Sequence, residues 1–346
     1  MSRPAAASEP PRSIVVAQLA FIGDMVFATP LLDEIRGRWP DAALAVVGRP
    51  AALEVLLDHP ANPELIAYDK GGRDRGAVGL LRVARAVRAR RPDVFLGVTR
   101  SGRTALLARL SGAPCRVGFR GPARGACYNH LVSRDDGHRR FPERPTALLS
   151  PFGPLPAPRP MSLAVGAARR AAAAEALAAA GWRGEPLLAI APGAHYATKR
   201  WPERHVAALL DLAAADGFAP ALYGGPEETA LVERLLAGRP RALDRRGVGI
   251  RGVAAELSLA AAFVGGDSGP AHIARALGTP AVVLHGPTDP TPLADGRPYV
   301  VLTVDLDCRP CSPHGDAVCP RGHHRCLEEI APERVLAAVR AAARGA

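Results

Sequence analysis

The 346-residue chain has few aromatic residues, only two lysines and no apolar run long enough to cross a membrane. Aromatic residues make up 5% of the chain and do not alternate with basic ones, so the pattern typical of single-strand binding by base stacking is missing. A membrane-spanning helix needs roughly 18 or more apolar residues. The first dozen residues also lack the charged and then apolar order of a secretion signal, so we expect a cytoplasmic protein.

Positive charge is abundant although lysine is rare. The formal net charge is +11, which indicates an anionic partner: nucleic acid, a phosphorylated substrate or an anionic membrane face. Charge alone does not distinguish these partners. Because arginine stands at almost every basic position, a remaining lysine marks a place that needs a compact ammonium. This applies to Lys199 more than to Lys70, which lies in a glycine-rich turn.

Common signatures of nucleotide and metal sites are also missing. The sequence contains no Walker A pattern and no His-Glu-x-x-His. Asp305-Leu306-Asp307 matches the short pattern that holds a divalent metal in some sugar transferases. Three residues of this kind also arise by chance, so we assign no metal to them.

Short apolar runs alternate with helical patterns along the whole chain, which predicts an α/β protein with parallel sheets. The first series has expected strands and helices at 13–19, 29–38, 43–47, 65–68, 78–90 and 94–98. Prolines gather between 141 and 160 and indicate an interdomain connection. The second series has expected elements at 166–180, 187–191, 204–216, 219–223, 227–236, around Val264, and at 281–285 and 332–343.

We therefore predict two Rossmann-like, doubly wound domains, an N-terminal one at 12–160 and a C-terminal one at 161–330. A C-terminal helix within 331–346 is expected to pack back on the N-terminal domain. In parallel sheets, ligands bind beyond the carboxyl ends of the strands. The natural active site is then a cleft between those ends.

The segment around Asp267-Ser268-Gly269 is the most informative part of the chain. An apolar strand ends in two glycines and leads through these residues directly into a helix, so free N–H groups at Ser268 and Gly269 form a seat for a diphosphate. The segment also looks like the nucleophile motif of trypsin-like proteases. Those proteases consist of antiparallel strands, so the predicted architecture argues against them, and labelling of Ser268 by a fluorophosphonate distinguishes the two readings.

One charged residue of interest follows the first strand of each half. Asp24 lies beside a tight turn near a helix N-terminus, where the dipole favours the ionised form that a general base needs. A turn aspartate that merely caps the helix gives the same pattern. Lys199 lies after the Pro192-Gly193 turn, where it can neutralise a diphosphate leaving group. A solvated basic loop is the alternative.

Two further groups of residues have alternative readings. Glu227 and Glu228 follow a strand-to-helix turn and either accept hydrogen bonds from ribose hydroxyls or cap the helix. A short segment rich in histidine holds four cysteines, for which a structural Zn²⁺ is one hypothesis, with free buried thiols or a redox-labile pair as alternatives. Those cysteines are Cys308, Cys311, Cys319 and Cys326.

Five motifs taken together resemble glycosyltransferase family 9, the ADP-heptose:lipopolysaccharide heptosyltransferases. They are Gly23-Asp24-Met25-Val26 with Thr29-Pro30, Pro192-Gly193 with Lys199-Arg200-Trp201-Pro202, Gly224-Gly225-Pro226-x-Glu228, Asp267-Ser268-Gly269-x-x-His272, and Gly286-Pro287-Thr288-Asp289. Their order and spacing match along most of the chain. The segments 112–121 and 322–327 look more like heptosyltransferase II than heptosyltransferase I.

The resemblance implies a GT-B fold and an inverting, metal-independent transfer of L-glycero-D-manno-heptose from ADP-heptose to the lipopolysaccharide inner core, on a heptosyl-Kdo2-lipid A type acceptor. No cofactor is required for this catalysis. By position, Asp24 would be the general base and Lys199 would stabilise the departing ADP. The resemblance places donor binding at Pro192, Gly193, Thr198, Lys199, Glu227, Glu228, Asp267, Ser268, Gly269 and His272.

The acceptor is a phosphorylated lipid A core, and guanidinium groups match phosphate geometry, so we expect Arg100, Arg103 and Arg120 to bind it. Such an acceptor places the enzyme peripherally at the cytoplasmic face of the inner membrane, without a nucleic-acid partner. Two alternatives remain. A GT-B enzyme can use another nucleotide sugar, or an epimerase-like reaction, for a different surface glycan, and a nucleic-acid-binding protein is supported by charge alone.

Overall fold

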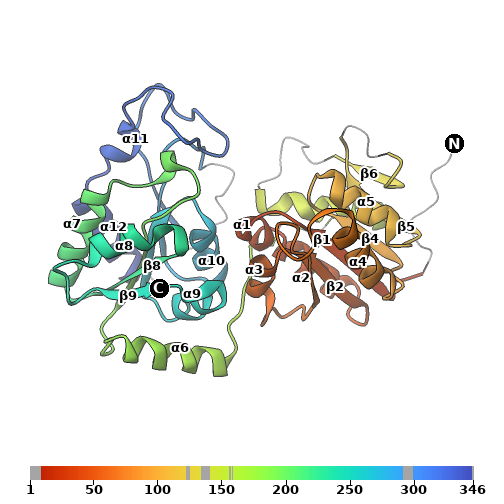
Figure 1. Cartoon of the computed structure of the whole chain (residues 1–346), viewed down its shortest axis with the longest axis horizontal. Helices are drawn as coiled ribbons and strands as arrows, with labels where there is room; N and C mark the ends of the chain where they lie inside the picture. The colour runs from red at the N-terminus through yellow and green to blue at the C-terminus, as the bar shows by residue number, and fades with distance from the viewer. Residues whose placement is uncertain are drawn as a thin grey trace. The chain divides into compact units, whose positions relative to one another are not determined.

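A computed structural model describes residues 9–121, 125–133, 141–155, 157, 159–290 and 299–344. The chain divides into two compact units, Met1–Ala164 and Val165–Ala346 (Figure 1). Each unit is built around a six-stranded sheet in which every neighbouring pair of strands is parallel. The division falls just after the proline-rich stretch.

The sheet of the first unit has the strand order β3-β2-β1-β4-β5-β6. Its strands are β1 (Ser13–Gln18), β2 (Ala43–Gly48), β3 (Glu64–Ala67), β4 (Val94–Gly97), β5 (Cys115–Phe119) and β6 (His130–Val132). The helices are α1 (Ile22–Val26), α2 (Thr29–Arg38), α3 (Pro50–Leu53), α4 (Gly76–Arg88) and α5 (Gly102–Leu110), with 3₁₀ helices η1 (Glu54–Leu56) and η2 (Phe141–Phe152).

Central strand β1 is apolar at successive positions because helices cover both faces of the sheet. Val15 and Ala17 pack against the buried face of α4, which presents Leu80 and Val83 at helical spacing. The arginines of α4 lie on the opposite, solvated side of the helix. This packing explains both the continuous apolar run of the strand and the periodic pattern of the helix.

One expectation for the first unit is corrected. Helix α2 begins at Thr29 as expected, with Ala28 as its cap residue, and the Thr29 hydroxyl donates to the Val26 carbonyl at 2.8 Å. The proline-rich stretch is not a plain connection, because its first part forms η2, which packs on α2 and β6 within the first unit. Proline fixes φ near the value that a 3₁₀ helix needs, so Pro145 is accommodated there.

The sheet of the second unit has the order β12-β11-β10-β7-β8-β9. Its strands are β7 (Leu187–Ala191), β8 (Ala219–Gly224), β9 (Leu243–Arg246), β10 (Ala262–Gly266), β11 (Ala281–Leu284) and β12 (Tyr299–Leu302). The helices are α6 (Ala167–Ala179), α7 (Glu203–Ala215), α8 (Thr229–Leu236), α9 (Gly249–Leu257), α10 (Gly269–Leu277), α11 (Arg325–Glu328) and α12 (Pro332–Arg344), with η3 (Ala197–Lys199) and η4 (Pro226–Glu228).

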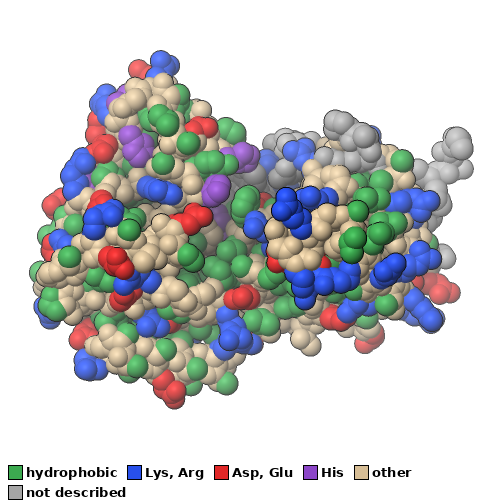
Figure 2. Space-filling model, in the orientation of Figure 1, with side chains coloured by type: hydrophobic (Ala, Val, Ile, Leu, Met, Phe, Trp, Pro, Cys, Tyr) green, Lys and Arg blue, Asp and Glu red, His purple; other side chains and the backbone are tan. Residues whose placement is uncertain are grey.

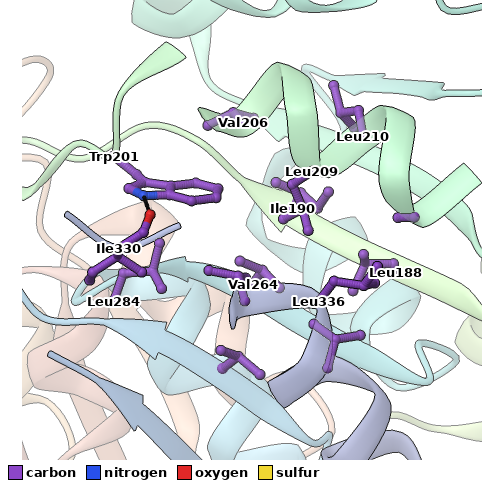
Figure 3. Packing of buried hydrophobic residues seen from close by; sticks show 14 of the residues in the cluster. Leu188, Ile190, Trp201, Val206, Leu209, Leu210, Val264, Leu284, Ile330 and Leu336 are labelled. Atoms are coloured by element: carbon purple, nitrogen blue, oxygen red, sulfur yellow. Dashed lines mark hydrogen bonds between the residues drawn. The ribbon is translucent and has the colours of Figure 1, made fainter. Parts of the chain in front are cut away.

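The core of the second unit lies between its sheet and helices α7 and α12. Ile190 and Val264 from the sheet pack with Leu209 of α7 and Leu336 of α12 (Figure 3). Each fully buried side chain of this size stabilises the fold by about 1.5–3 kcal/mol. The apolar face of the C-terminal helix α12 therefore belongs to the core of the second unit, and packing of this helix on the first unit stays a prediction.

Both sheets share one topology, in which the chain runs outward from a central strand, returns to its other side and runs outward again. The reversal lies between β1 and β4 in the first unit and between β7 and β10 in the second. Ligands bind beyond the carboxyl ends of the strands at such a switch point. Within the described residues, no helix is long and apolar enough to cross a membrane.

Candidate active site

An ion pair between Lys199 and Asp267 lies at the switch point of the second unit. Lys199 Nζ is 2.6 Å from Asp267 Oδ2 and also donates to the Asp267 carbonyl oxygen at 3.2 Å. The side chains are 13% and 14% exposed, so solvent screens this pair much less than a surface pair. The lysine and the aspartate come from the loops after β7 and β10, the two strands on either side of the reversal.

The surroundings keep Asp267 ionised. Burial alone raises the pKa of the Asp267 carboxyl, but hydrogen bonding to His272 and the charges of His272, Lys199 and His285 outweigh burial and hold this pKa well below its usual range. His272 Nε2 is 3.4 Å from Asp267 Oδ1. A permanently charged carboxylate therefore fixes the Lys199 ammonium beside the start of α10.

The glycines at the end of β10 explain how Lys199 reaches this place. A Cβ added at Gly266 would lie 2.6 Å from the Lys199 carbonyl oxygen, and one at Gly265 would lie 3.1 Å from the Ala191 carbonyl oxygen. Only glycine lets the backbone of the Lys199 loop lie directly against the tip of the strand. The two glycines thus place the lysine beside Asp267, 68 positions away in the sequence.

Helix α10 begins beside this ion pair with a free N-terminus. Ser268 is its cap residue and has an extended backbone, but its side chain makes no capping hydrogen bond. The Ser268 hydroxyl oxygen is buried, and among the described residues it has no hydrogen-bond partner. The first-turn N–H groups and the helix dipole are thus arranged as the predicted anion seat requires, and phosphate binding there stays a prediction.

The same arrangement rules out the protease reading. Both units have parallel sheets instead of the antiparallel strands of trypsin-like enzymes. Among the described residues, no base is hydrogen-bonded to the buried Ser268 hydroxyl, as an activated serine nucleophile requires.

Among the other predicted donor residues, Glu228 lies beside the Pro192-Gly193 turn after β7. Glu228 leans over Gly193, where an added Cβ would lie 2.4 Å from Glu228 Cγ, and Glu228 Oε2 accepts a hydrogen bond from the Gly225 N–H at 2.9 Å. Pro192 is buried directly after β7, whereas Glu227 is exposed. Glu228 thus caps its own turn and also borders Gly193.

The Thr198 hydroxyl is bonded within the protein. Its hydroxyl donates to the Asp316 carbonyl oxygen at 2.9 Å and accepts from the Asp316 N–H at 2.8 Å. The residue is 4% exposed. The hydroxyl is therefore engaged within the protein in both of its hydrogen-bonding roles.

A buried polar network behind Asp267 was not anticipated from the sequence. His285 is fully buried, its Nε2 is 2.8 Å from the Tyr299 hydroxyl, and its Nδ1 is 3.3 Å from Thr288 Oγ1. Thr288 Oγ1 in turn donates to Asp267 Oδ2 at 3.3 Å. Burial lowers the pKa of His285 to about 4, although the charge of Asp267 opposes this shift. The only sequence signal was a histidine directly after the apolar β11 strand.

In the first unit, Asp24 lies in α1 just beyond the carboxyl end of β1. Its Oδ2 accepts a hydrogen bond from the Phe21 N–H at 3.2 Å, so the capping reading is observed. Gln18 Nε2 donates to the Asp24 carbonyl oxygen at 3.1 Å, which holds the turn against the strand. The carboxylate is half-buried and fixed at the sheet edge, as the base reading also requires.

Several cations gather at the same edge of the first sheet. Lys70 Nζ donates to the Leu19 carbonyl oxygen at 2.9 Å, and burial together with the charges of Arg49 and Arg103 lowers the pKa of Lys70. Arg49 lies over the Phe21 ring at 5.3 Å. The motif reading missed Arg49 and Lys70, although both directly follow ends of parallel strands.

The three predicted acceptor residues are all exposed and follow β4 or β5. They are Arg100, Arg103 and Arg120. Lysine and arginine side chains are spread over the face of the first unit that Figure 2 shows. The charge of Arg103 acts on Lys70, so Arg103 belongs with the cations Lys70 and Arg49 at this edge.

The cysteine segment does not form a metal-ligand set. No three His, Cys, Asp or Glu side chains in the described part of the chain lie together so that they could hold a metal ion. Cys308 Sγ is 3.9 Å from His323 Nε2, and all four thiols are free. Burial raises the pKa of Cys326 to about 11, so that thiol stays protonated. The spacing that suggested zinc is therefore not accompanied by converging ligands.

Comparison with known proteins gives a consistent relationship. A model of glycosyltransferase family 9 (heptosyltransferase) matches residues 80–321. The chain is 25% identical over 350 residues to lipooligosaccharide heptosyltransferase 2 of Haemophilus ducreyi, a match that spans 93% of this chain and 97% of that protein.

Solved structures show the same fold. A family 9 glycosyl transferase from Veillonella parvula superposes with a TM-score of 0.86 at 23% identity, covering 97% of this chain and 98% of that one. The ADP-heptose lps heptosyltransferase II of E. coli superposes with a TM-score of 0.79 at 24% identity, covering 96% and 99%. The fold is therefore GT-B-like, and because the family model matches well over half of the sequence, the chain belongs to glycosyltransferase family 9, the heptosyltransferases.

Proposed function

We propose that this family 9 enzyme moves L-glycero-D-manno-heptose from ADP-heptose onto the inner core of lipopolysaccharide, with inversion at the anomeric carbon. The relatives named as heptosyltransferase 2 and heptosyltransferase II support this reaction. The observation that carries the proposal is the Lys199–Asp267 ion pair beside the free N-terminus of α10. A diphosphate leaving group needs this combination of a fixed cation and N–H donors.

The second unit would bind the donor. The N–H groups at Ser268 and Gly269 hold the phosphates, and the ammonium of Lys199 neutralises the charge that develops as the bond between the anomeric carbon and the β-phosphate oxygen breaks. Asp267 holds the ammonium in place, and His272 supports Asp267. Glu228, which borders Gly193, accepts hydrogen bonds from the ribose hydroxyls.

The first unit would bind the acceptor. Asp24 takes the proton from the acceptor hydroxyl. At the same time, the oxygen of that hydroxyl forms the new bond to the anomeric carbon, opposite the departing ADP. Arg100, Arg103 and Arg120 bind acceptor phosphates, and Lys70 and Arg49 extend this cationic edge. The reaction needs no metal ion, because Lys199 and the helix dipole supply the positive charge.

Because the proposed acceptor is a phosphorylated lipid, the reaction would take place at a membrane surface. We propose a cytoplasmic enzyme that attaches peripherally to the inner membrane. The net charge of +11 supports attraction to an anionic leaflet.

Replacement of Asp24 tests the proposed reaction. We expect Asp24→Asn to keep ADP-heptose binding and to lower turnover by about 10²- to 10⁴-fold, because the amide cannot accept the proton. The matched control is Asp305→Asn, which removes an exposed carboxylate and should leave turnover unchanged. Turnover of Asp24→Asn at the wild-type rate would reject the assigned base, and product analysis with ADP-, UDP- and GDP-sugars separates the proposal from use of another donor.

A further inference from the structure

The segment between Cys308 and Asp316 is anchored on both sides of the Lys199–Asp267 ion pair. On one side, the N–H groups of Cys311 and Ser312 donate to the Pro287 carbonyl oxygen at 3.0 and 3.2 Å. Pro287 precedes Thr288, whose hydroxyl donates to Asp267. We call residues 308–316 the strap.

The other anchor holds the loop that carries Lys199. Asp316 makes three backbone hydrogen bonds with Thr198, since its carbonyl oxygen accepts from the Thr198 hydroxyl at 2.9 Å and from the Thr198 N–H at 3.2 Å, and its own N–H donates to the hydroxyl at 2.8 Å. His324 Nε2 also lies 2.9 Å from the Thr198 carbonyl oxygen. Thr198, the residue directly before Lys199, is therefore held by Asp316, which lies 118 positions later in the sequence.

Gly315 lies against the side chain of Lys199. A Cβ added at Gly315 would lie 3.0 Å from Tyr196 Cβ, 3.1 Å from Lys199 Cγ and 3.2 Å from Lys199 Cε, closer than ordinary van der Waals contact. The Gly315 N–H donates to Ser312 Oγ at 3.0 Å, which fixes the turn, and its φ of +91° favours glycine. On the sheet side, the backbone of the same lysine rests on Gly266.

We infer that the strap positions Lys199, with Gly315 and the Thr198–Asp316 clamp as the positioning residues. This inference rests on the proposed role of Lys199 in stabilising the departing diphosphate. The strap lies against the aliphatic stem of Lys199 at Gly315, and the tip of β10 lies against the backbone of the same lysine at Gly266. Between these contacts, the ammonium points at Asp267. A long, flexible side chain is thereby held in one geometry before the donor binds.

Two glycines of the same C-terminal region give a matched test. Gly315→Ala places a methyl group against Lys199, whereas Gly322→Ala imposes a similar left-handed strain, at φ +73°, with no atom within 4 Å of the new Cβ. We expect Gly315→Ala to lower kcat by about tenfold, with the KM for ADP-heptose changed less, and Gly322→Ala to keep the wild-type kcat. Thermal unfolding of both variants shows whether strain alone separates them.

The clamp is tested separately by the Thr198 hydroxyl. Thr198→Val keeps the size of the side chain and removes both hydroxyl hydrogen bonds, so kcat should fall, whereas Thr198→Ser keeps the hydroxyl and should restore most of it. Each of these changes is then combined with Lys199→Ala. If the strap acts through the lysine, Gly315→Ala and Thr198→Val cause no further loss in that background.

The outcomes separate this inference from the proposed function. Wild-type turnover in Lys199→Ala would reject the proposed role of the lysine. Two other results would reject only the positioning role and leave the proposed function standing. In the first, Lys199→Ala loses turnover but Gly315→Ala behaves like Gly322→Ala. In the second, the losses add fully in the double variants.

Discussion

At the scale of single residues, the candidate site depends on a few buried charges that neutralise one another. Asp267 stays ionised because Lys199 and His272 contact it, and His285 stays neutral because burial lowers its pKa to about 4. Burial acts on both groups, but only the carboxylate has direct cationic partners. The opposite outcome at two neighbouring side chains follows from this difference.

The neutral state of His285 makes the stability of the second unit depend on pH. The unfolded chain takes up a proton near pH 6.5, but folded His285 does so only near pH 4. Its contribution to stability is therefore complete above pH 6.5 and is lost as the pH falls from 6.5 toward 4, by about 2 kcal/mol between pH 7 and pH 5.

Urea unfolding at pH 7 and pH 5 measures this contribution. The free energy of unfolding of the wild type should fall more steeply than that of His285→Gln, which has no titrating group at this position. Equal pH slopes for the two proteins would contradict the buried neutral histidine.

At the scale of elements, the close packing of the Lys199 loop on β10 depends on the absence of a side chain at Gly266. Gly266→Ala would bring its Cβ within 2.6 Å of the Lys199 carbonyl oxygen, so the loop must move. We expect the variant to lose at least about tenfold in ADP affinity and about 1–3 kcal/mol in stability. Gly71→Ala, where the added Cβ has no atom within 4 Å and the backbone is not left-handed, is the control for a glycine change in the first unit. ADP affinity equal to that of the wild type would show that the loop does not need this contact.

Most central strands and edge strand β3 could be predicted from sequence, whereas edge strands β6, β9 and β12 could not. Strands such as β7 and β10 are buried on both faces, so they are continuous apolar runs. Edge strand β9 instead contains Arg245, which pairs with the buried Glu256 of α9, and no apolar pattern reveals it. The charge of Arg245 hides this strand from an apolar pattern, because its partner Glu256 lies on the next helix, α9.

The candidate site shows the same division. The motif residues beside Asp267 follow directly from the rule that parallel strands end at one edge. The Thr198–Asp316 clamp joins residues far apart in the chain, and the sequence motifs place Thr198 with the donor without revealing this clamp. Sequence patterns identify which residues are present at a site, but competition between protein partners and ligands for a hydrogen bond is decided only by the packing.

At the scale of the whole molecule, the two units repeat one topology and carry different chemistry. The first unit gathers Lys70, Arg49 and Arg103 near the segment that precedes Asp24, and the second holds an ion pair at the start of a helix. This division matches a basic, phosphorylated-acceptor side and a nucleotide side. The positive net charge belongs to the same account, since both proposed substrates are anionic.

The proposed mechanism predicts that turnover is independent of metal ions. Lysine and helix dipole replace the cation that a metal-dependent transferase uses, so removal of divalent ions with EDTA should change kcat by less than about twofold. The assay is run on dialysed protein with and without EDTA. A loss of turnover that added Mg²⁺ or Zn²⁺ restores would contradict the mechanism.

Calorimetric titration with ADP is the most direct measurement of the central claim, which is that Lys199 and the start of α10 form the diphosphate site. The wild type and Asp24→Asn should bind ADP with equal affinity, and Lys199→Ala should bind it at least about tenfold more weakly. Equal ADP affinity in the wild type and Lys199→Ala would contradict the account.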